Sequence, residues 1–546
     1  MAPPDGAQTG SRYVLEAVAA EGVETLFGLI GEGNAHLLDR THDAAVAFAP
    51  ARHEMAAVSM ADGYARTTDG VGVCTLTHGP GVTNAATGIA AADRDNVPLV
   101  VLVGDTASAG RERSLQYLDH ETFTGPISAA QTRVETTAGL PSSLARAFDR
   151  ARTERGPVVV VLPEDVLEGP APDRAYQPRT RPRQRVRPDV ERLTEAAALV
   201  DDATNPVVLA GGGAARADAG DAVGAFATHV GAPVATTYFA RGLLPDGHPL
   251  ATGIAGTFMT PANDEVLWDA DVVVAVGARL SGKTTRYGDL FADADVVQVD
   301  IDETAIGTHQ SPAVGVVGDA RATVAALTDR TAACPDRADR VAATVAAAPS
   351  PWADGFEDHP DLIDPREFTV ELSARTPDDA VVTVGSGNNT GFPAVFHDVG
   401  ADGAMYVNGN FGTMGYAVPA ALGASVAAPD RPVVCYTGDG ALLQVVQEIE
   451  TGVRLGCPVV VAVLNDSSYG IIRHRQQRVH GRETASSYDS PAFVDVAEGF
   501  GAIAHEVRAP ADLDVVDAYL DGDHTVPLVL DARTIPSVSR PGFPPY

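Results

Sequence analysis

Short apolar runs alternate with alanine-rich helical stretches along the whole chain. The runs are rich in Val and are bounded by Gly, Pro or Asp. Continuous apolar runs of this length are typical of parallel strands buried on both faces, and the stretches between them are typical of covering helices. The pattern therefore predicts an α/β fold in which helices cover parallel sheets.

The predicted strands fall into three blocks. A Pro- and Arg-rich segment, residues 168–188, separates the first two blocks, and an Ala/Pro/Asp-rich stretch from about 334 to 365 separates the last two. We therefore expect three α/β domains, at residues 1–170, 189–334 and 365–546. The predicted strands are residues 71–76, 98–103 and 157–162; then 206–210, 271–276 and 295–301; then 380–384, 432–436, 458–464 and 527–530.

The composition suits a large, strongly acidic globular protein. The 546 residues are 45% hydrophobic and 20% charged, and 39 Lys and Arg against 72 Asp and Glu give a net charge of −33. Such a surface disfavours nucleic acid and anionic membranes as partners. No leader pattern and no apolar run near the roughly 18 residues of a membrane span is evident. We therefore expect a soluble, cytoplasmic protein of halophilic type, whose self-repulsion is screened by salt.

Two scarce residue types restrict the chemistry. Lys283 is the sole lysine, so Schiff-base aldolases and pyridoxal-phosphate enzymes are nearly excluded. The four cysteines, Cys74, Cys334, Cys435 and Cys457, lie far apart without metal-type spacing. This suits a reducing compartment and predicts cysteines that act as buried apolar residues.

The strongest local signal lies in the third block. Gly438-Asp439-Gly440 follows one predicted strand, and Asn465-Asp466 follows the next. Both therefore lie at carboxyl ends of strands, where open α/β sheets bind ligands. Paired oxygen ligands beside glycines favour a magnesium ion that carries a diphosphate. A single Gly-Asp-Gly would be read as an ordinary turn, but the pair favours the metal site.

The second signal lies in the first block, where Arg52-His53-Glu54 opens a helical stretch of small apolar residues. A carboxylate in such a run is expected to be desolvated, which suits a group that accepts and returns protons. The simpler alternative is a carboxylate in the first turn of a helix. The glycine-rich loop 77–81, with Asn84 just beyond it, would let the backbone approach a flat ligand.

Together these motifs resemble the thiamine-diphosphate enzymes that act on 2-oxo acids, most closely the acetolactate synthase (acetohydroxyacid synthase) catalytic subunits. The resemblance implies a pyrimidine-binding domain, a central Rossmann-like domain and a diphosphate-binding domain. The matching motifs, in family order, are Arg52-His53-Glu54, Gly79-Pro80-Gly81, Phe411-Gly412-Thr413-Met414-Gly415 and Gly438-Asp439-Gly440.

The resemblance also implies roles for these residues. Glu54 is expected to bind the aminopyrimidine ring, the Gly412 carbonyl its amino group, and Met414 the underside of the cofactor. The magnesium ligands implied are Asp439, Asp466 and the backbone oxygen of Ser468. The other cofactor contacts implied are Ser386, Gly387, Asn388, Gly438, Gly440, Ala441 and Asn84.

The match is weaker around the substrate. Gln116 agrees with a glutamine that lines the active site in this family. The family more often has an aromatic residue at Leu115, a lysine at Glu164, a tryptophan at Arg475 and a serine at His78. These departures leave the cofactor chemistry intact and concern the second substrate.

The central block has two interpretations. Gly211-Gly212-Gly213 follows a predicted strand, as in dinucleotide-binding folds, but Arg216 stands where a third glycine is expected. In the resembled family this domain either binds FAD without a redox role or is purely structural. Both interpretations stay open at this point.

The sequence thus predicts an enzyme that binds thiamine diphosphate and magnesium, decarboxylates a pyruvate-like 2-oxo acid and joins the remainder to a second 2-oxo acid. In the resembled family this reaction belongs to branched-chain amino acid biosynthesis. One alternative is a non-ligating decarboxylase of the benzoylformate or indolepyruvate type. Another is a non-catalytic nucleotide-binding or regulatory protein, against which Glu54, Asp439 and Gln116 argue. The resemblance further implies a homodimer or homotetramer with active sites at the subunit interface, and a small regulatory subunit.

Overall fold

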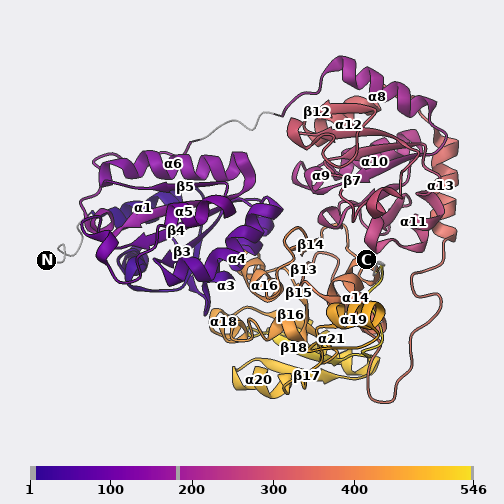
Figure 1. The fold of residues 1–546 in the computed structure, drawn as a ribbon. Coiled ribbons are helices and arrows are strands. Elements are labelled where there is room, and N and C mark those ends of the chain that lie inside the picture. Colours follow the sequence, from indigo (N-terminus) through magenta and orange to yellow (C-terminus); the bar gives the residue numbers. More distant parts are fainter. Residues whose placement is uncertain (1–7, 180–184, 543–546) are drawn as a thin grey trace.

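The computed structural model describes residues 8–179 and 185–542, and five residues of the first predicted linker, 180–184, lie outside them. The strands of the described residues form three separate parallel sheets with helices on their faces, one sheet for each of three domains (Figure 1). This confirms the predicted α/β fold.

The first sheet has the strand order β2-β1-β3-β4-β6-β5. Strands β3, β4 and β6 were predicted to within two residues, whereas β1, β2 and β5 were missed because four-residue strands carry no long apolar run. The elements are α1 (Gly10–Ala20), β1 (Thr25–Gly28), α2 (Ala35–Asp39), β2 (Ala47–Pro50), α3 (Glu54–Thr68), β3 (Gly72–Thr77), α4 (Pro80–Asp95), β4 (Leu99–Asp105), α5 (His120–Thr124), β5 (Ala130–Arg133), α6 (Leu140–Arg150), β6 (Pro157–Pro163) and α7 (Glu164–Glu168).

The second sheet has the order β12-β11-β10-β7-β8-β9. Helix α13 begins beyond residue 334, where the domain was expected to end, and packs against α10 and α11. The elements are α8 (Val190–Asp202), β7 (Pro206–Ala210), α9 (Gly212–Arg216), α10 (Gly220–Val230), β8 (Val234–Thr236), β9 (Ala251–Ile254), α11 (Pro261–Val266), β10 (Val272–Val276), β11 (Asp295–Asp300), β12 (Val314–Val317), α12 (Ala320–Thr328) and α13 (Pro335–Ala347).

The third sheet, β14-β13-β15-β16-β18-β17, repeats the strand order of the first. The elements are α14 (Pro365–Arg375), β13 (Val381–Val384), α15 (Gly391–Phe396), β14 (Ala404–Val407), α16 (Ala417–Ala427), β15 (Val433–Gly438), α17 (Asp439–Leu442), α18 (Glu448–Leu455), β16 (Val459–Asn465), α19 (Gly470–His480), α20 (Phe493–Gly499), β17 (Ile503–Val507), α21 (Asp514–Leu520) and β18 (Leu528–Arg533).

These strand orders locate the ligand-binding edges. In the first sheet the order reverses between β1 and β3, and in the third between β13 and β15. At such a switch point the connections leave toward opposite faces, so a crevice opens beyond the carboxyl ends of the two strands. The loops after β3, β13 and β15 are therefore the ones best placed to hold a ligand.

The first and third domains of the chain pack directly on each other through α3 and α16 (Figure 1). One cluster of buried apolar side chains runs through both domains and includes Val58 of α3 and Ala421 of α16. A Cβ atom on Gly63 would stand 2.0 Å from the carbonyl oxygen of Ala420, so the two helices cross with their backbones in contact. The two domains thus share one core.

The helices and the cysteines of the described residues bear on two further expectations. None of their helices is both long enough and apolar enough to cross a bilayer. All four cysteines are free thiols, and Cys74, Cys435 and Cys457 are buried, as predicted, while Cys334 is partly exposed. Burial raises the pKa of the Cys74 and Cys435 thiols to about 12, so neither is a reactive thiolate at neutral pH.

Candidate functional site

Glu54 is the first residue of α3 and is only 7% exposed. The backbone N–H of Met55 donates to His53 Nδ1, which caps the start of the helix. Asn84 Nδ2 donates to the Glu54 carboxylate over 3.0 Å. Asn84 lies in α4, which begins at Pro80, so residues 80 and 81 of the predicted loop 77–81 are helical. The structure thus brings these two predicted site residues together.

Gln116 meets the glycine-rich turn after β3. Gly79 has a φ of 59°, and a Cβ atom there would lie 2.4 Å from the Gln116 carbonyl oxygen, so only glycine fits this position. The Gln116 side chain is exposed, as is that of Leu115 beside it. Gln116 therefore lies at the same edge of the first sheet as Glu54 and Asn84.

Behind this turn lies a polar cluster that the sequence did not indicate. The Gly79 N–H donates to His120 Nε2 over 3.1 Å, while His120 Nδ1 lies 3.7 Å from Asp105 Oδ2, and Asp105 is paired with Arg133 at 2.5 Å. Burial lowers the pKa of His120, which keeps the imidazole neutral. A neutral ring that accepts at Nε2 carries its proton on Nδ1, toward Asp105. This cluster fixes the turn that supports Gln116.

Asp439, at the start of α17, is buried, and Asp466, directly after β16, is half-buried, so the two carboxylates lie at neighbouring strand ends. Burial raises the pKa of both carboxyl groups, and the charge of Asp439 adds to burial in raising the pKa of Asp466 to about 6. A divalent cation between two such carboxylates would remove this repulsion. Their oxygen donors fit the preference of Mg²⁺.

Ser468 completes the tight turn after β16. Its hydroxyl donates to Asp466 Oδ1 over 2.8 Å, and Ser467 adopts a φ of 54°. A Cβ atom on Gly470 would lie 2.4 Å from Asp466 Oδ2. The turn therefore holds the Asp466 carboxylate in place, and Gly470 makes room for it.

The loop after β13 lies next to this turn. Asn388 is held at its side chain, since Oδ1 accepts from the Arg540 N–H at 3.0 Å and Nδ2 donates to the Val538 carbonyl. A Cβ atom on Gly470 would stand 3.0 Å from the Cβ of Asn388, which places the two loops in contact. Ser386, Gly387 and Asn388 thus face the same crevice edge as the residues after β15 and β16.

Gly440, which follows Asp439, is covered by two aromatic residues that the sequence reading missed. A Cβ atom on Gly440 would lie 2.8 Å from both a Tyr469 ring carbon and the Tyr488 hydroxyl. The two rings meet edge to face with centroids 5.3 Å apart. Any larger residue at 440 would push these rings away from the turn Gly438 to Ala441.

The loop 411–415 is fastened by Asn408, another residue that the sequence did not single out. Its Oδ1 accepts from the N–H groups of Gly412, at 2.9 Å, and Thr413, at 3.2 Å. Asn408 Nδ2 and Thr413 Oγ1 are buried and find no hydrogen-bond partner among the described residues, so a polar cofactor would satisfy them. Gly412 has a φ of 74°, and Met414 is partly exposed beside it.

The segment that carries Glu54 is attached to the third domain of the same chain. The Arg52 N–H donates to the buried Glu448 carboxylate, and the Arg52 guanidinium pairs with Glu450 at 2.7 Å. The Met55 methyl lies 3.2 Å from where a Cβ on Gly415 would stand. These contacts, with the α3–α16 crossing, join the first and third domains within one chain.

The glycine turn after β7 of the central domain packs against Gly277. Cβ atoms on Gly211 and Gly213 would lie 2.3 and 2.7 Å from the backbone of Gly277, and the Arg216 guanidinium lies against Gly212. Burial, with the charge of Arg155 next, lowers the pKa of Arg216 to about 10, which still leaves it charged. Gly211 is buried, whereas Gly212 and Gly213 are partly exposed, so FAD binding at this turn stays a prediction.

The structure also places four other residues that were named from the sequence. Arg475 is exposed on α19, the helix that begins just after the Asp466 turn. Lys283 is exposed in the central domain, where its carbonyl accepts from Thr257. Glu164 pairs with His36. His78, next to Gly79, is 2% exposed, and its Nδ1 has no hydrogen-bond partner within residues 8–179 and 185–542.

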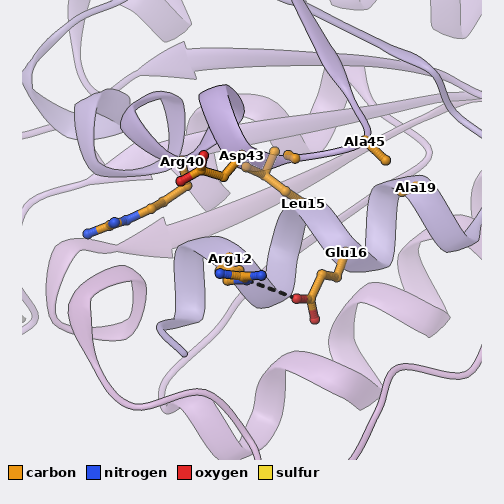
Figure 2. Close-up of a pocket in the computed structure, with 8 residues that line it drawn as sticks. Arg12, Leu15, Glu16, Ala19, Arg40, Asp43 and Ala45 are labelled. Atoms are coloured by element: carbon orange, nitrogen blue, oxygen red, sulfur yellow. Dashed lines mark hydrogen bonds and ion pairs between the residues drawn. The ribbon is translucent and has the colours of Figure 1, made fainter. Parts of the chain in front are cut away.

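Two surface cavities lie in the first domain. One, of about 320 Å³, lies between α1 and the segment around Arg40, lined by Arg12, Leu15, Glu16 and Asp43 among others (Figure 2). None of the predicted site residues lines it. The other cavity, of about 550 Å³, is lined by residues 108 to 113 of the segment that continues to Gln116.

Comparison with protein families matches all three domains. Residues 8–138 match the N-terminal TPP binding domain of thiamine pyrophosphate enzymes. Residues 193–327 match their central domain, and residues 385–532 match their C-terminal TPP binding domain.

Individual relatives are similar over most of their length. The acetolactate synthase large subunit of Corynebacterium glutamicum is 33% identical over 526 residues, 91% of this chain and 82% of the relative. The acetolactate synthase isozyme 3 large subunit of Escherichia coli is 32% identical over 529 residues, 93% of this chain and 91% of the relative. The acetolactate synthase of Mycobacterium leprae is 32% identical over 539 residues, 93% and 84% of the two chains.

Proposed function

Because the chain belongs to the thiamine pyrophosphate enzyme family and is an enzyme of the acetolactate synthase type, we propose that it joins two 2-oxo acids. One pyruvate loses carbon dioxide, and its remaining two carbons form a bond to the keto carbon of the second acid. Two pyruvate anions and one proton thus give 2-acetolactate and carbon dioxide, and the proton ends on the new hydroxyl group.

The observation that carries the proposal is the convergence of Asp439 and Asp466 on one sheet edge, beside the loop 386–388. Asp439, Asp466 and Ser468 would hold Mg²⁺, whose charge would offset the two carboxylates and favour the binding of a diphosphate. Thiamine diphosphate supplies the electron sink for decarboxylation. Ser386, Gly387 and Asn388, with Gly438, Gly440 and Ala441, would hold its diphosphate end, and Gly412 and Met414 its ring end.

Glu54 acts as the proton-transfer group in this proposal. It is buried at the start of α3, close to the loop 411–415 of the docked domain. Asn84 donates to one carboxylate oxygen and so fixes the rotation of the group. A carboxylate oriented in this way can hold a proton at the cofactor ring and return it during each turnover.

The second 2-oxo acid needs donors that fix its carboxylate near the reacting carbon. We assign Gln116, exposed on the turn over Gly79, and Arg475, exposed on α19, to this task. One donor then comes from each of the two docked domains. An acceptor held in this way competes with simple protonation, which would release an aldehyde.

The relatives that are named large subunits suggest the assembly. We propose a homodimer or homotetramer with active sites at the subunit interface, and a small regulatory subunit as a further partner. We also propose a cytoplasmic, salt-adapted enzyme of branched-chain amino acid biosynthesis, consistent with the net charge of −33.

The proposal is tested by release of carbon dioxide from pyruvate in concentrated potassium chloride. We expect release only when thiamine diphosphate and Mg²⁺ are both present after exhaustive dialysis against a chelator. Equal release without either, in protein shown to retain neither, would contradict the cofactor assignment.

A further inference from the structure

Three metal-ligating side chains converge on the first domain, away from Asp439 and Asp466. His36 lies on α2, and Glu164 and Glu168 lie one turn apart on α7. His36 Nε2 is 3.3 Å from Glu164 Oε1, and His36 Nδ1 is 3.3 Å from Glu168 Oε1. One ligand atom from each residue lies within 4.8 Å of the other two. The three side chains are thus close enough to share one ion, which would bind one of the two ring nitrogens of His36.

The chemistry of this group requires a cation. A neutral imidazole carries one N–H, so one ring nitrogen of His36 presents a lone pair to a carboxylate. That contact becomes favourable only when a proton or a metal ion lies between the two groups. Two carboxylates beside one ring also concentrate negative charge on an already acidic surface.

The donor set distinguishes the metal. One imidazole nitrogen with two carboxylate oxygens suits Zn²⁺ and related transition-metal ions, whereas the all-oxygen set at Asp439 and Asp466 suits Mg²⁺. The His36 side chain is 39% exposed, and both glutamates are 45% exposed, so an ion can enter from solvent and complete its shell with water.

We propose that His36, Glu164 and Glu168 form a second metal site, which binds one divalent transition-metal ion such as Zn²⁺. The two helices that supply the ligands pack against each other and against α1, so the donors are held by a rigid scaffold.

The site is connected to the loop of Gln116. Asp165, next to Glu164, accepts from the Ser108 N–H at 3.0 Å and from its hydroxyl at 3.2 Å. Ser108 begins the surface segment that continues to Gln116 over the Gly79 turn. An ion that holds α7 in place therefore also holds the start of this segment.

The test is calorimetric titration of Zn²⁺ into protein that is first saturated with Mg²⁺ and thiamine diphosphate, at pH 7.5. We expect one Zn²⁺ per chain, and at least tenfold weaker binding in both His36→Ala and Glu168→Gln. His42→Ala removes a nearby exposed histidine and serves as the matched control, with unchanged binding.

All three ligand side chains are partly exposed, so these variants should unfold at the wild-type temperature, which circular dichroism checks. Visible absorption of Co²⁺ bound to the wild type, absent from His36→Ala, would support the imidazole ligand. Wild-type protein that binds no Zn²⁺ under these conditions would overturn the proposal. Unchanged affinity in His36→Ala and Glu168→Gln would overturn it as well.

Discussion

Gly423 of α16 lies so close to Met60 of α3 that a Cβ atom on the glycine would stand 1.9 Å from the Met60 carbonyl oxygen. Gly63 makes the reciprocal contact with Ala420, at 2.0 Å. Because α3 begins at Glu54 and α16 directly follows the loop 411–415, this crossing determines how the proton-transfer group meets the third domain.

We therefore expect Gly423→Ala to separate the two helices. Overpacking of a tight contact costs about 1–3 kcal/mol, so the free energy of unfolding should fall by that amount in denaturant titration. Turnover should fall more than tenfold, because misplacement of a catalytic group by about 1 Å has effects of this size. The control Gly499→Ala lies at an exposed helix position with open space around it. It should lower neither the free energy of unfolding nor the turnover rate. A Gly423→Ala variant with the same free energy of unfolding as the wild type would contradict the close contact between α3 and α16.

Glu54→Gln keeps the shape of the side chain and removes its ability to hold a proton. General acid–base groups contribute about 10²–10⁴ in rate, so kcat should fall by at least about a hundredfold. Thiamine diphosphate affinity, followed by fluorescence quenching, should stay within about tenfold, and the fold should be intact.

Glu16→Gln, on the exposed face of α1, is the matched control for this substitution and should leave kcat unchanged. A Glu54→Gln enzyme with near-normal kcat would remove Glu54 from the reaction.

Asp466 offers a graded test of the metal assignment. Asp466→Asn retains one oxygen ligand, whereas Asp466→Ala retains none, so thiamine diphosphate binding should weaken in the order wild type, Asn, Ala. Excess Mg²⁺ should partly restore the Asn variant. Asp495→Ala, at an exposed position of α20, should bind like the wild type. Equal cofactor affinity in the Ala variant would exclude Asp466 as a ligand.

His397 should make the protein sensitive to acid. Burial, with the charge of Arg241 next, lowers the pKa of His397 to about 3, and its Nδ1 lies 2.9 Å from the buried Tyr436 hydroxyl. The unfolded chain binds a proton here below about pH 6.5, and the folded chain does not until about pH 3. Between these values the free energy of unfolding falls as pH falls, by up to about 1.4 kcal/mol per pH unit from this group.

His397→Gln removes this group, so its free energy of unfolding should vary less between pH 6.5 and pH 4.5 than that of the wild type. His42→Gln, at an exposed position, should keep the wild-type slope. Equal slopes in wild type and His397→Gln would contradict the neutral buried state.

The sequence predicted those parts of the structure whose signal is local. Strands β15 and β16 are long apolar runs, and Asp439 and Asp466 follow them directly, so both the strands and the sheet edge could be inferred. Short strands such as β1 and β8 were not predicted, because three or four residues are too few to show a continuous apolar run.

Residues that act through distant contacts could not be inferred. The Glu448 carboxylate accepts a hydrogen bond from Arg52, which lies 396 positions away in the sequence. His120 accepts one from Gly79, which lies 41 positions away. Asn408 could not be singled out, because its hydrogen bond to Gly412 forms only when the loop 411–415 folds against it. The docking of the first and third domains within one chain likewise depends on two glycines whose partners lie hundreds of residues away.

The most direct measurement is the product that the wild-type enzyme makes from pyruvate alone, with Mg²⁺, thiamine diphosphate and concentrated potassium chloride. The account predicts 2-acetolactate as the main product, with one carbon dioxide released for each molecule formed, and a lower ratio of acetolactate to acetaldehyde in Arg475→Ala. Acetaldehyde as the only wild-type product, again with one carbon dioxide each, would contradict the carboligation and assign the enzyme to the non-ligating decarboxylases.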